Sequence, residues 1–161
     1  MQGITTCLWF DGRAEEAVKF YGSVFKYLEV RTVTRTGKEV AEAARIPEGS
    51  VLTISFKLAN LEFLALNGGP QFKFSEAISL IVNCDTQNEI DWFWEKLSEG
   101  GGEKGQCGWL KDKYGLSWQI VPTVLAKLMQ DKNAAKTERV MAALMQMQKL
   151  DIEALKKAYS G

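Results

Sequence analysis

The chain has 161 residues, with 20 basic and 20 acidic side chains and no histidine. Balanced charge gives no electrostatic case for binding nucleic acid or an anionic membrane, and the lack of imidazole excludes Ser-His-Asp catalysis, a histidine general base and histidine-ligated metals. A hydrophobic content of 46% over this length suits a compact domain that folds without a metal or a disulfide.

The first half of the chain has the pattern of one helix among four strands. Short runs of β-branched and aromatic residues predict the strands, and apolar residues at helical spacing predict the helix. Asp11-Gly12 is a turn pair after the first strand. Glu15 and Glu16 stand in the first turn of the helix, where the helix dipole favours negative charge. We expect these elements at residues 4–10 (strand), 13–26 (helix), 28–36, 51–58 and 61–67 (strands).

Two segments of this half are expected to be irregular. Residues 37–50 are polar and contain Pro47 and Gly49, which favours a loop with at most one helical turn. Residues 71–76 follow a Gly-Gly-Pro sequence and are typical of a linker.

The same order of strand, turn and helix begins again after this linker. Residues 77–84 predict a strand, and Asp85 and Thr86 are suited to cap the helix that follows. A run of three glycines at 100–102 ends this helix, and two short strands are expected at 106–111 and 116–121.

A self-match at an offset of 73 residues favours an internal repeat. The offset places the apolar positions of the first helix on those of the second, for example Ala17 on Ile90 and Tyr21 on Trp94. It also places the strand at 4–10 on residues 77–83. Agreement in the order of strand, turn, helix and helix end indicates two related modules.

After residue 122 the pattern predicts only helices, over 123–130, 134–149 and 151–159. The methionines concentrated there are typical of adaptable packing, and we expect the tail to cover a sheet or a partner subunit. The predicted organisation is a first module (1–70), a second, shortened module (71–122) and a helical extension (123–161), within a single compact domain.

Three dispersed cysteines and the N-terminal segment bear on the compartment. An odd number of separated cysteines is typical of reduced thiols and excludes CxxC motifs. The N-terminal segment has no basic stretch followed by an apolar run, and no apolar stretch approaches the ~20 residues that span a bilayer. We therefore expect a cytoplasmic protein.

A βαβββ unit followed by a shortened second copy resembles the vicinal oxygen chelate superfamily, which includes glyoxalases, bleomycin-resistance proteins and dioxygenases. Three runs resemble its PhnB-like branch: LWFDG with AEEA and FY (8–21), LALNGGP with FKF (64–74), and CGWLKDKYG through SWQIVP (107–122). This branch is often labelled the 3-demethylubiquinone-9 3-methyltransferase family. The resemblance implies an α+β fold of paired βαβββ modules forming a curved mixed sheet around a ligand cavity, with a helical C-terminal extension, and a homodimer.

The same resemblance defines where a metal centre would lie. Metal-binding members place a histidine in the first strand of each module and a glutamate in the last strand. These positions fall at Thr6, Ser79, Gln119 and, depending on register, Leu64 or Ala65. Uncharged hydroxyl and amide groups bind divalent cations weakly, so we expect neither a metal nor another cofactor.

Gln119 is the foremost candidate for ligand contact. If Trp118 and Ile120 pack against helices, strand alternation directs Gln119 into the cavity. Its amide would then orient a substrate group, or it would be satisfied by a neighbouring backbone group. Both interpretations stay open from the sequence.

Other candidates have a functional and a structural interpretation. Cys7 and Cys107 are expected on strands, but without histidine as a base, packing is favoured over a nucleophilic role. Trp109 is suited to line a cavity or a core, and Asn67 to a cavity mouth or a turn. The candidate ligand-binding residues are Thr6, Cys7, Asn67, Gln71, Ser79, Trp109 and Gln119; no catalytic residue is identified.

These observations favour metal-free binding of a small organic molecule in the sheet cavity. One alternative is a metal-dependent lyase, isomerase or dioxygenase of the same superfamily, and another is a dimeric interaction module. Methyl transfer, which the family label names, finds no support, because no strand, Gly-rich turn, helix and acidic ribose-binding residue follow one another. We expect a small-molecule partner, no nucleic acid and no membrane.

Overall fold

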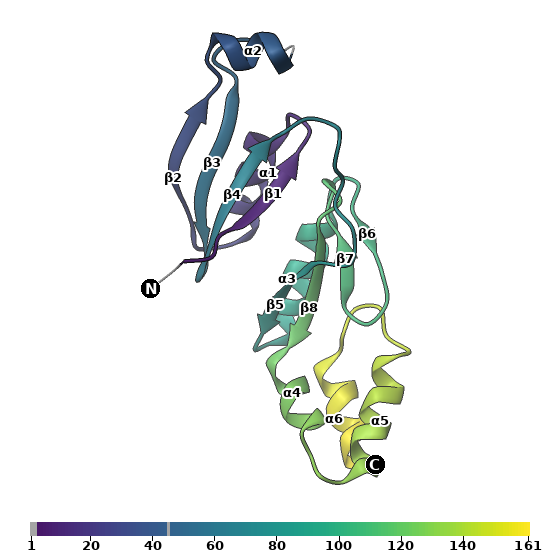
Figure 1. Ribbon diagram of the computed structural model, residues 1–161. Helices are drawn as coiled ribbons and strands as arrows, with labels where there is room; N and C mark the ends of the chain where they lie inside the picture. The colour runs from purple at the N-terminus through teal and green to yellow at the C-terminus, as the bar shows by residue number, and fades with distance from the viewer. Residues whose placement is uncertain (1–2, 45) are drawn as a thin grey trace. The chain divides into compact units, whose positions relative to one another are not determined.

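The computed structural model describes residues 3–44 and 46–161, which form two compact units, Met1–Lys73 and Phe74–Gly161, each with its own mixed sheet of four strands (Figure 1). The α+β fold with a helical C-terminal extension is therefore confirmed. The first unit contains β1 (Thr6–Phe10), α1 (Ala14–Val24), β2 (Leu28–Arg35), α2 (Lys38–Ala44), β3 (Val51–Leu58) and β4 (Leu61–Asn67). The second contains β5 (Ser79–Cys84), α3 (Gln87–Ser98), β6 (Glu103–Lys104), β7 (Trp109–Lys111), β8 (Ser117–Pro122), α4 (Thr123–Met129), α5 (Ala134–Leu144) and α6 (Ile152–Ser160).

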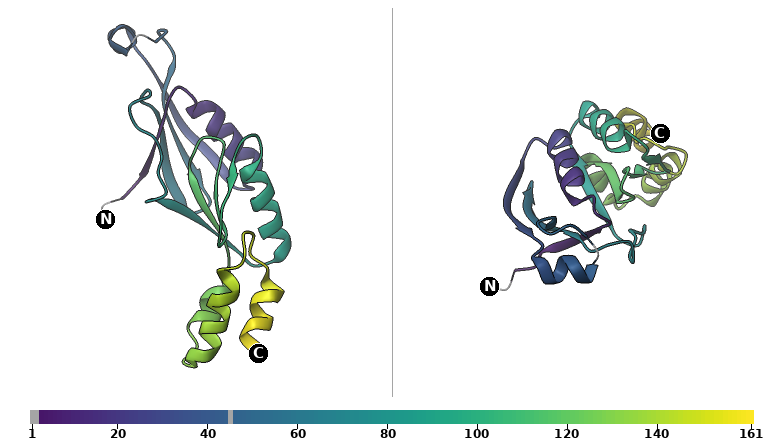
Figure 2. Two further views of the ribbon diagram at one scale, coloured as in Figure 1. Left: turned by 90° about the vertical axis from the view of Figure 1, so that its right-hand side faces the viewer. Right: turned by 90° about the horizontal axis from the view of Figure 1, so that it is seen from above.

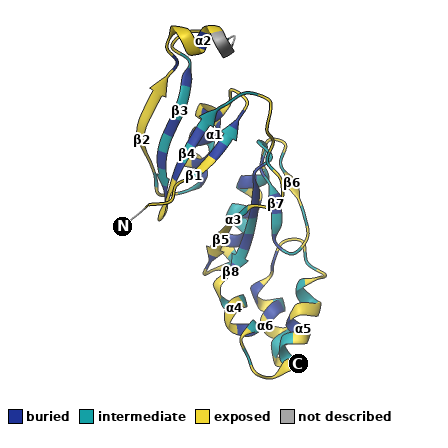
Figure 3. Cartoon of the chain, in the orientation of Figure 1, coloured by how far each residue is buried: buried dark blue, intermediate teal, exposed yellow. Residues whose placement is uncertain are grey.

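The sheet of the first unit has the strand order β1-β4-β3-β2, with β1 parallel to β4 and the other pairs antiparallel. Its buried residues alternate along the strands with more exposed ones (Figure 3), as a sheet covered on one side requires. The aromatic rings of Phe56 and Phe63 stack on the covered side, with centroids 5.2 Å apart. Helix α1 buries Ala17, Val18 and Tyr21.

The sheet of the second unit has the strand order β5-β8-β7-β6. As in the first unit, its first and last strands, β5 and β8, pair in parallel, and the other pairs are antiparallel. Helix α3 begins at a capping box, in which Thr86 and Glu89 bond each other's backbone N–H groups, confirming the predicted cap. Ile90 and Trp94 are buried on α3, as are Trp118 and Ile120 on β8. We call the opposite side of each sheet its open face, that is, the side away from buried Phe56 and Phe63 in the first unit and away from buried Trp118 and Ile120 in the second.

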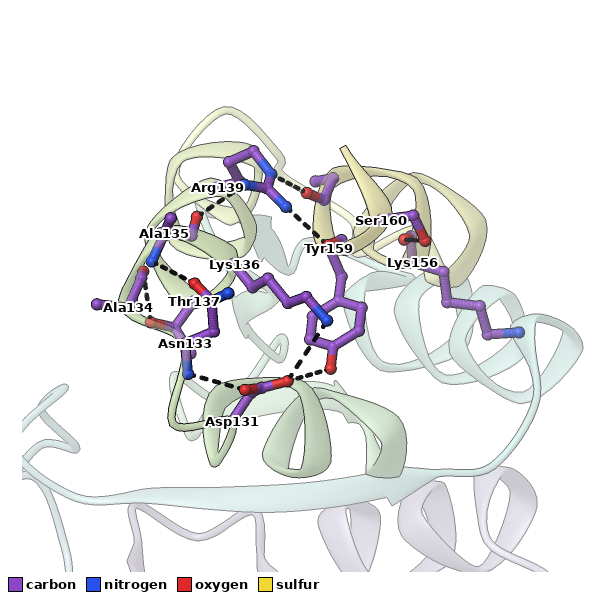
Figure 4. Close-up of polar contacts among 11 residues, drawn as sticks. Asp131, Asn133, Ala134, Ala135, Lys136, Thr137, Arg139, Lys156, Tyr159 and Ser160 are labelled. Atoms are coloured by element: carbon purple, nitrogen blue, oxygen red, sulfur yellow. Dashed lines mark hydrogen bonds and ion pairs between the residues drawn. The ribbon is translucent and has the colours of Figure 1, made fainter.

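The three C-terminal helices pack around a small core of their own (Figure 2). Leu128, Val140 and Leu155 are buried there, one from each helix. Arg139 donates hydrogen bonds to the carbonyl oxygens of Ala158 and Tyr159, both at 2.9 Å, and closes the last turn of α6 (Figure 4).

The chain before α6 is fastened to the second sheet unit. Gln87 Nε2 donates to the Leu150 carbonyl at 3.1 Å, and Gln87 Oε1 accepts from the Ile152 backbone N–H at 3.0 Å. Lys149 Nζ lies 2.7 Å from Asp91 Oδ1. These contacts join the tail to the first turns of α3.

Two predicted segments differ from the structure. Residues 38–44 form the two-turn helix α2 rather than a loop, and its residue Ala41 is buried. The strand expected at 106–111 begins only at Trp109, because the backbone N–H groups of Cys107 and Gly108 bond the carbonyls of Met147 and Gln148. Cys107 has a φ of 57°, a left-handed conformation that a strand does not contain.

The extent of two further elements also differs from the prediction. Helix α5 ends at Leu144, five residues before the predicted end at 149, and β6 was not predicted. Within the described residues, no helix has the length and apolar character needed to cross a membrane.

Candidate functional site

The open face of the second sheet carries two adjacent rows of polar and aromatic side chains. Ser79, Ser117 and Lys111 are register partners across β5, β8 and β7, and Glu103 of β6 extends this row. In the next row, Gln119 lies between Ile81 and Trp109. Since side chains alternate between the faces of a strand, the rows share the face opposite buried Trp118 and Ile120.

Gln119 is held by the neighbouring strand. Its Nε2 donates a hydrogen bond to Ser79 Oγ at 2.8 Å. No described residue donates to Gln119 Oε1, and the side chain is half-buried. The sequence left open whether the amide is satisfied internally or turned to a ligand; among the described residues, its nitrogen bonds the Ser79 hydroxyl and its oxygen has no partner.

A pocket of about 230 Å³ opens on the same face. Its lining includes Trp109, Lys111, Ser117, Glu76 and Glu103. Ser117 is 1% exposed, and no partner for its hydroxyl lies among the described residues. A buried hydroxyl without a hydrogen bond is rare and costs about 1–3 kcal/mol, which makes this atom a candidate for bonding a group from outside the chain.

Lys111 lies in the lining of the pocket, and two carboxylates hold its ammonium group. Its Nζ forms an ion pair with Glu76 Oε1 and lies 3.8 Å from Glu103 Oε2. The hydrogen bond from Lys111 lowers the pKa of Glu76, and the bond to Glu76 raises the pKa of Lys111. A lysine kept protonated in this way is not a general base for Ser117.

The two first-strand positions of the expected metal slots, Thr6 and Ser79, lie on different faces of their own sheets. Thr6 shares the covered side of β1 with buried Leu8 and Phe10, whereas Ser79 lies on the open face of β5. The cause is a connection of different length, since residues 11–13 join β1 to α1 but only 85–86 join β5 to α3. The offset of 73 therefore aligns the two helices, but it matches residues on the covered side of β1 with residues on the open face of β5.

The other candidates of the first unit have different surroundings. Cys7 is exposed on the open face of β1, and Gln71 is exposed in the segment after β4. Asn67 Oδ1 accepts from the Ala14 backbone N–H at 2.9 Å, and its Nδ2 donates to the Val51 carbonyl at 2.9 Å. Asn67 thus caps α1 from β4, where Arg13 at the N-cap forms no side-chain cap. Both polar atoms of its side chain therefore bond the backbone within the first unit.

The donor set does not fit a divalent metal centre. Ser79 and Gln119 offer neutral oxygens and bond each other, and the Thr6 hydroxyl is a neutral donor on the covered side of its own sheet. Across residues 3–44 and 46–161, no three cysteine, aspartate or glutamate side chains are grouped to hold a metal ion. Divalent cations prefer charged oxygen ligands in larger number.

Sequence reasoning missed Ser117, Lys111, Glu76 and Glu103 as members of one site. Ser117 and Lys111 each stand two residues from a predicted candidate, Gln119 and Trp109 respectively, and so share their faces. That spacing was a usable signal. The approach of Glu76 and Glu103 to Lys111 depends on tertiary structure, and no pattern in the sequence indicated it.

A family model and a solved structure carry the same family description. The model of the 3-demethylubiquinone-9 3-methyltransferase family matches residues 2–121. The structure of the PhnB protein of Bacillus cereus, which carries the same family description, is 34% identical, covers 76% of this chain and all of its own, and aligns with a TM-score of 0.62. Among curated proteins, no relative matches this chain.

A second solved structure shares the fold at lower identity. Protein PA1353 of Pseudomonas aeruginosa is 16% identical, covers 76% of this chain and 98% of its own, and aligns with a TM-score of 0.59. The predicted resemblance to this family is therefore confirmed: the chain belongs to the 3-demethylubiquinone-9 3-methyltransferase family, of which it is a PhnB-like member.

Proposed function

We propose that this protein binds a small organic molecule, without a metal, on the open face of its second sheet. The observation that supports this most directly is the pocket of about 230 Å³, with the indole of Trp109 and the unpartnered hydroxyl of Ser117 in its lining. Small-molecule sites combine apolar or aromatic walls with a few placed polar groups. Gln119 and Ser79, in the adjoining rows, add an available amide oxygen and a hydroxyl.

The volume bears on the size of the occupant. Drug-sized ligands fill pockets of about 300–1,000 Å³, and this one is smaller. We therefore expect a metabolite of modest size. Cys7 and Gln71, on the first unit, stay predictions from the sequence and are not needed for this site.

Direct binding measurements test the proposal. A panel of small planar and amphipathic metabolites is titrated by calorimetry and by tryptophan fluorescence against the wild type, Trp109→Phe, Gln119→Ala and, as a control on an exposed glutamine of the tail, Gln146→Ala. We expect a compound that binds the wild type to give no fluorescence response with Trp109→Phe. We expect it to bind Gln119→Ala about tenfold more weakly. If no compound binds, or if both site variants bind like the control, the proposal fails.

We propose further that the two sheet units are copies of one module and that the chain forms a cytoplasmic homodimer. The shared strand order of the two sheets supports the first point. The homodimer is supported by two exposed apolar side chains: Ile81 on the edge strand β5, and Ile78 directly before that strand. Light scattering coupled to size exclusion gives the mass; a monomer at high protein concentration would refute the dimer.

Methyl transfer, which the family description names, is not part of this proposal. In each module the strand after the helix lies at the opposite edge of the sheet from the first strand, so the two do not pair. A methyl-donor site built on a parallel βαβ unit has no counterpart in this topology.

A further inference from the structure

The pocket beside Lys111 has a charge balance that selects among small molecules. Two carboxylates, Glu76 and Glu103, and two ammonium groups, Lys104 and Lys111, contribute to its lining. Lys104 Nζ lies 2.7 Å from Glu95 Oε2, and Glu95 is not a lining residue. The charge of Lys104 is therefore compensated from outside, and Glu76, Glu103 and Lys111 leave one negative charge in excess.

Glu103 is the carboxylate that carries this excess. Lys111 pairs closely with Glu76 but lies 3.8 Å from Glu103, at the limit of an ion pair. The side chain of Glu103 is 77% exposed, so a ligand reaches it without breaking the Glu76–Lys111 pair. An anionic ligand would instead have to displace a carboxylate from Lys111 and face both glutamates.

The aromatic wall favours the same sign of charge. Trp109 is half-buried in the lining of the pocket, and a tryptophan ring attracts cations through its electron-rich face. At the other end of the row lies Ser117, whose buried hydroxyl has no partner within the described part of the chain. Glu103 and Ser117 flank Lys111 on neighbouring strands, so about 10 Å, two strand spacings, separates their backbones.

We infer that the pocket takes a small organic cation, an amine or quaternary ammonium compound, with its nitrogen between Glu103 and Trp109 and an oxygen hydrogen-bonded to Ser117 Oγ. This inference rests on the proposed function, whose ligand class it specifies. The two glutamates select a positively charged ligand, and Trp109 offers an apolar contact for an alkylated nitrogen. Ser117 requires a polar group within a few bonds of that nitrogen.

Three probes of one shape and different charge test the inference by calorimetry: choline, its uncharged isostere 3,3-dimethyl-1-butanol, and the anion 3,3-dimethylbutanoate. We expect choline to bind and the uncharged isostere to bind about tenfold more weakly, since the cation–aromatic and carboxylate attractions are lost. We expect no heat from the anion. Added salt should weaken choline binding, because the carboxylate involved is exposed.

Variants locate the site. Glu103→Gln is expected to weaken choline binding three- to fivefold, and Glu153→Gln, the same change on α6, to leave it unchanged. Ser117→Ala is expected to weaken binding about fivefold and to raise the unfolding temperature of the free protein, because it removes an unsatisfied buried hydroxyl. A hydroxyl with a purely structural role would give lower stability instead.

The outcomes separate this inference from the proposed function. If the isostere or the anion binds as tightly as choline and Trp109→Phe abolishes that binding, the pocket is a small-molecule site but the cation class is wrong. If Glu103→Gln and Glu153→Gln behave alike, the assignment of the nitrogen is wrong. If neither these probes nor any member of the metabolite panel binds, both the inference and the proposed function fail.

Discussion

Trp118 Nε1 donates a hydrogen bond to Asp112 Oδ2 at 2.9 Å, and both side chains are buried. The other carboxylate oxygen of Asp112 accepts from the backbone N–H groups of Tyr114 and Leu116, at 2.9 and 3.1 Å. Two lysines flank Asp112 in the sequence, a pattern typical of a solvated turn, but the structure shows a buried carboxylate that fastens the turn between β7 and β8. That turn fixes the register of Lys111 and Ser117 in the candidate site.

Asp112→Asn should therefore destabilise the protein. An amide nitrogen cannot accept the hydrogen bonds that one carboxylate oxygen accepts, and a buried hydrogen bond to a charged group is worth about 1.5–3 kcal/mol. The free energy of unfolding in urea measures the loss. Asp11→Asn, on an exposed aspartate before α1, serves as the control and should cost less than 0.5 kcal/mol. Equal stability of the two variants would show that the Asp112 bonds contribute nothing.

Gly68→Ala should also destabilise, through a steric clash in the first unit. A Cβ atom at residue 68 would overlap the six-membered ring of Trp9, and the Trp9 indole is held by a hydrogen bond to the Gly69 carbonyl at 2.8 Å. Overpacking of this kind costs about 1–3 kcal/mol. Gly37→Ala, where the added Cβ meets no atom within 4 Å, is the matched control in thermal unfolding. A Gly68→Ala protein as stable as this control would mean that the Trp9 ring shifts freely.

The three thiols should differ in reactivity. Burial raises the pKa of Cys84 to about 12, with smaller contributions from Glu89 and Asp85, whereas Cys7 is exposed. Because the thiolate is the reactive form, an alkylating agent at pH 8 should label Cys7 first and Cys84 only after unfolding. Peptide mass spectrometry over time gives the order, and early labelling of Cys84 would contradict its burial.

The raised pKa of Cys84 also makes the stability of the protein depend on pH. The folded protein keeps the proton that the unfolded chain releases near the ordinary value of 9.0. The contribution of this thiol to stability is therefore complete below pH 9 and is lost as the pH rises toward 12. Cys84→Ala should remove this part of the alkaline loss, so its stability should fall less steeply between pH 9 and 11.

Acid should loosen the C-terminal helices through Asp131. The hydrogen bond from the Tyr159 hydroxyl, followed by that from the Asn133 backbone N–H, lowers the pKa of Asp131 below its ordinary value of 3.8 (Figure 4). A carboxyl with a lowered folded pKa stabilises above pH 3.8, and this contribution disappears as the pH falls through the folded value.

Tyr159→Phe tests this linkage. The variant lacks the main cause of the shift, so the stability difference from the wild type should be constant above pH 5 and shrink below pH 4, followed by circular dichroism in urea. Lys132→Ala, an exposed change in the same loop, should give a difference that does not vary with pH. A Tyr159→Phe difference that stays constant down to pH 2 would show that Tyr159 does not set the Asp131 pKa.

Divalent metals should leave the stability unchanged. A metal at one hundred times its dissociation constant stabilises the folded protein by about 2.7 kcal/mol, but Ser79 and Gln119 supply only neutral, mutually bonded donors. We expect no rise in unfolding temperature with Mn²⁺, Fe²⁺, Ni²⁺ or Zn²⁺. A rise that persists in Cys7→Ser and disappears in Gln119→Ala would contradict this expectation.

The sequence alone determined the elements whose signals are local. Short runs of strand-forming residues predicted β3 and β4 to the residue, and the Thr86 capping position and the apolar spacing predicted α3. Motifs along most of the chain indicated the family. Alternation around buried Trp118 and Ile120 also directed Gln119 to the open face. Each of these features depends on residues close together in the chain.

Only the tertiary structure decided what depends on distant groups. The hydrogen bonds that the backbone N–H groups of Cys107 and Gly108 donate to the carbonyls of residues 147 and 148 shortened β7, and Asn67 proved to cap α1 across 53 residues. A connection shorter by one residue turned Ser79 to the open face while Thr6 stayed on the covered side. The pairing of Glu76 with Lys111 and the isolation of the Ser117 hydroxyl arise the same way, because partners far apart in the chain leave no periodic trace in its sequence.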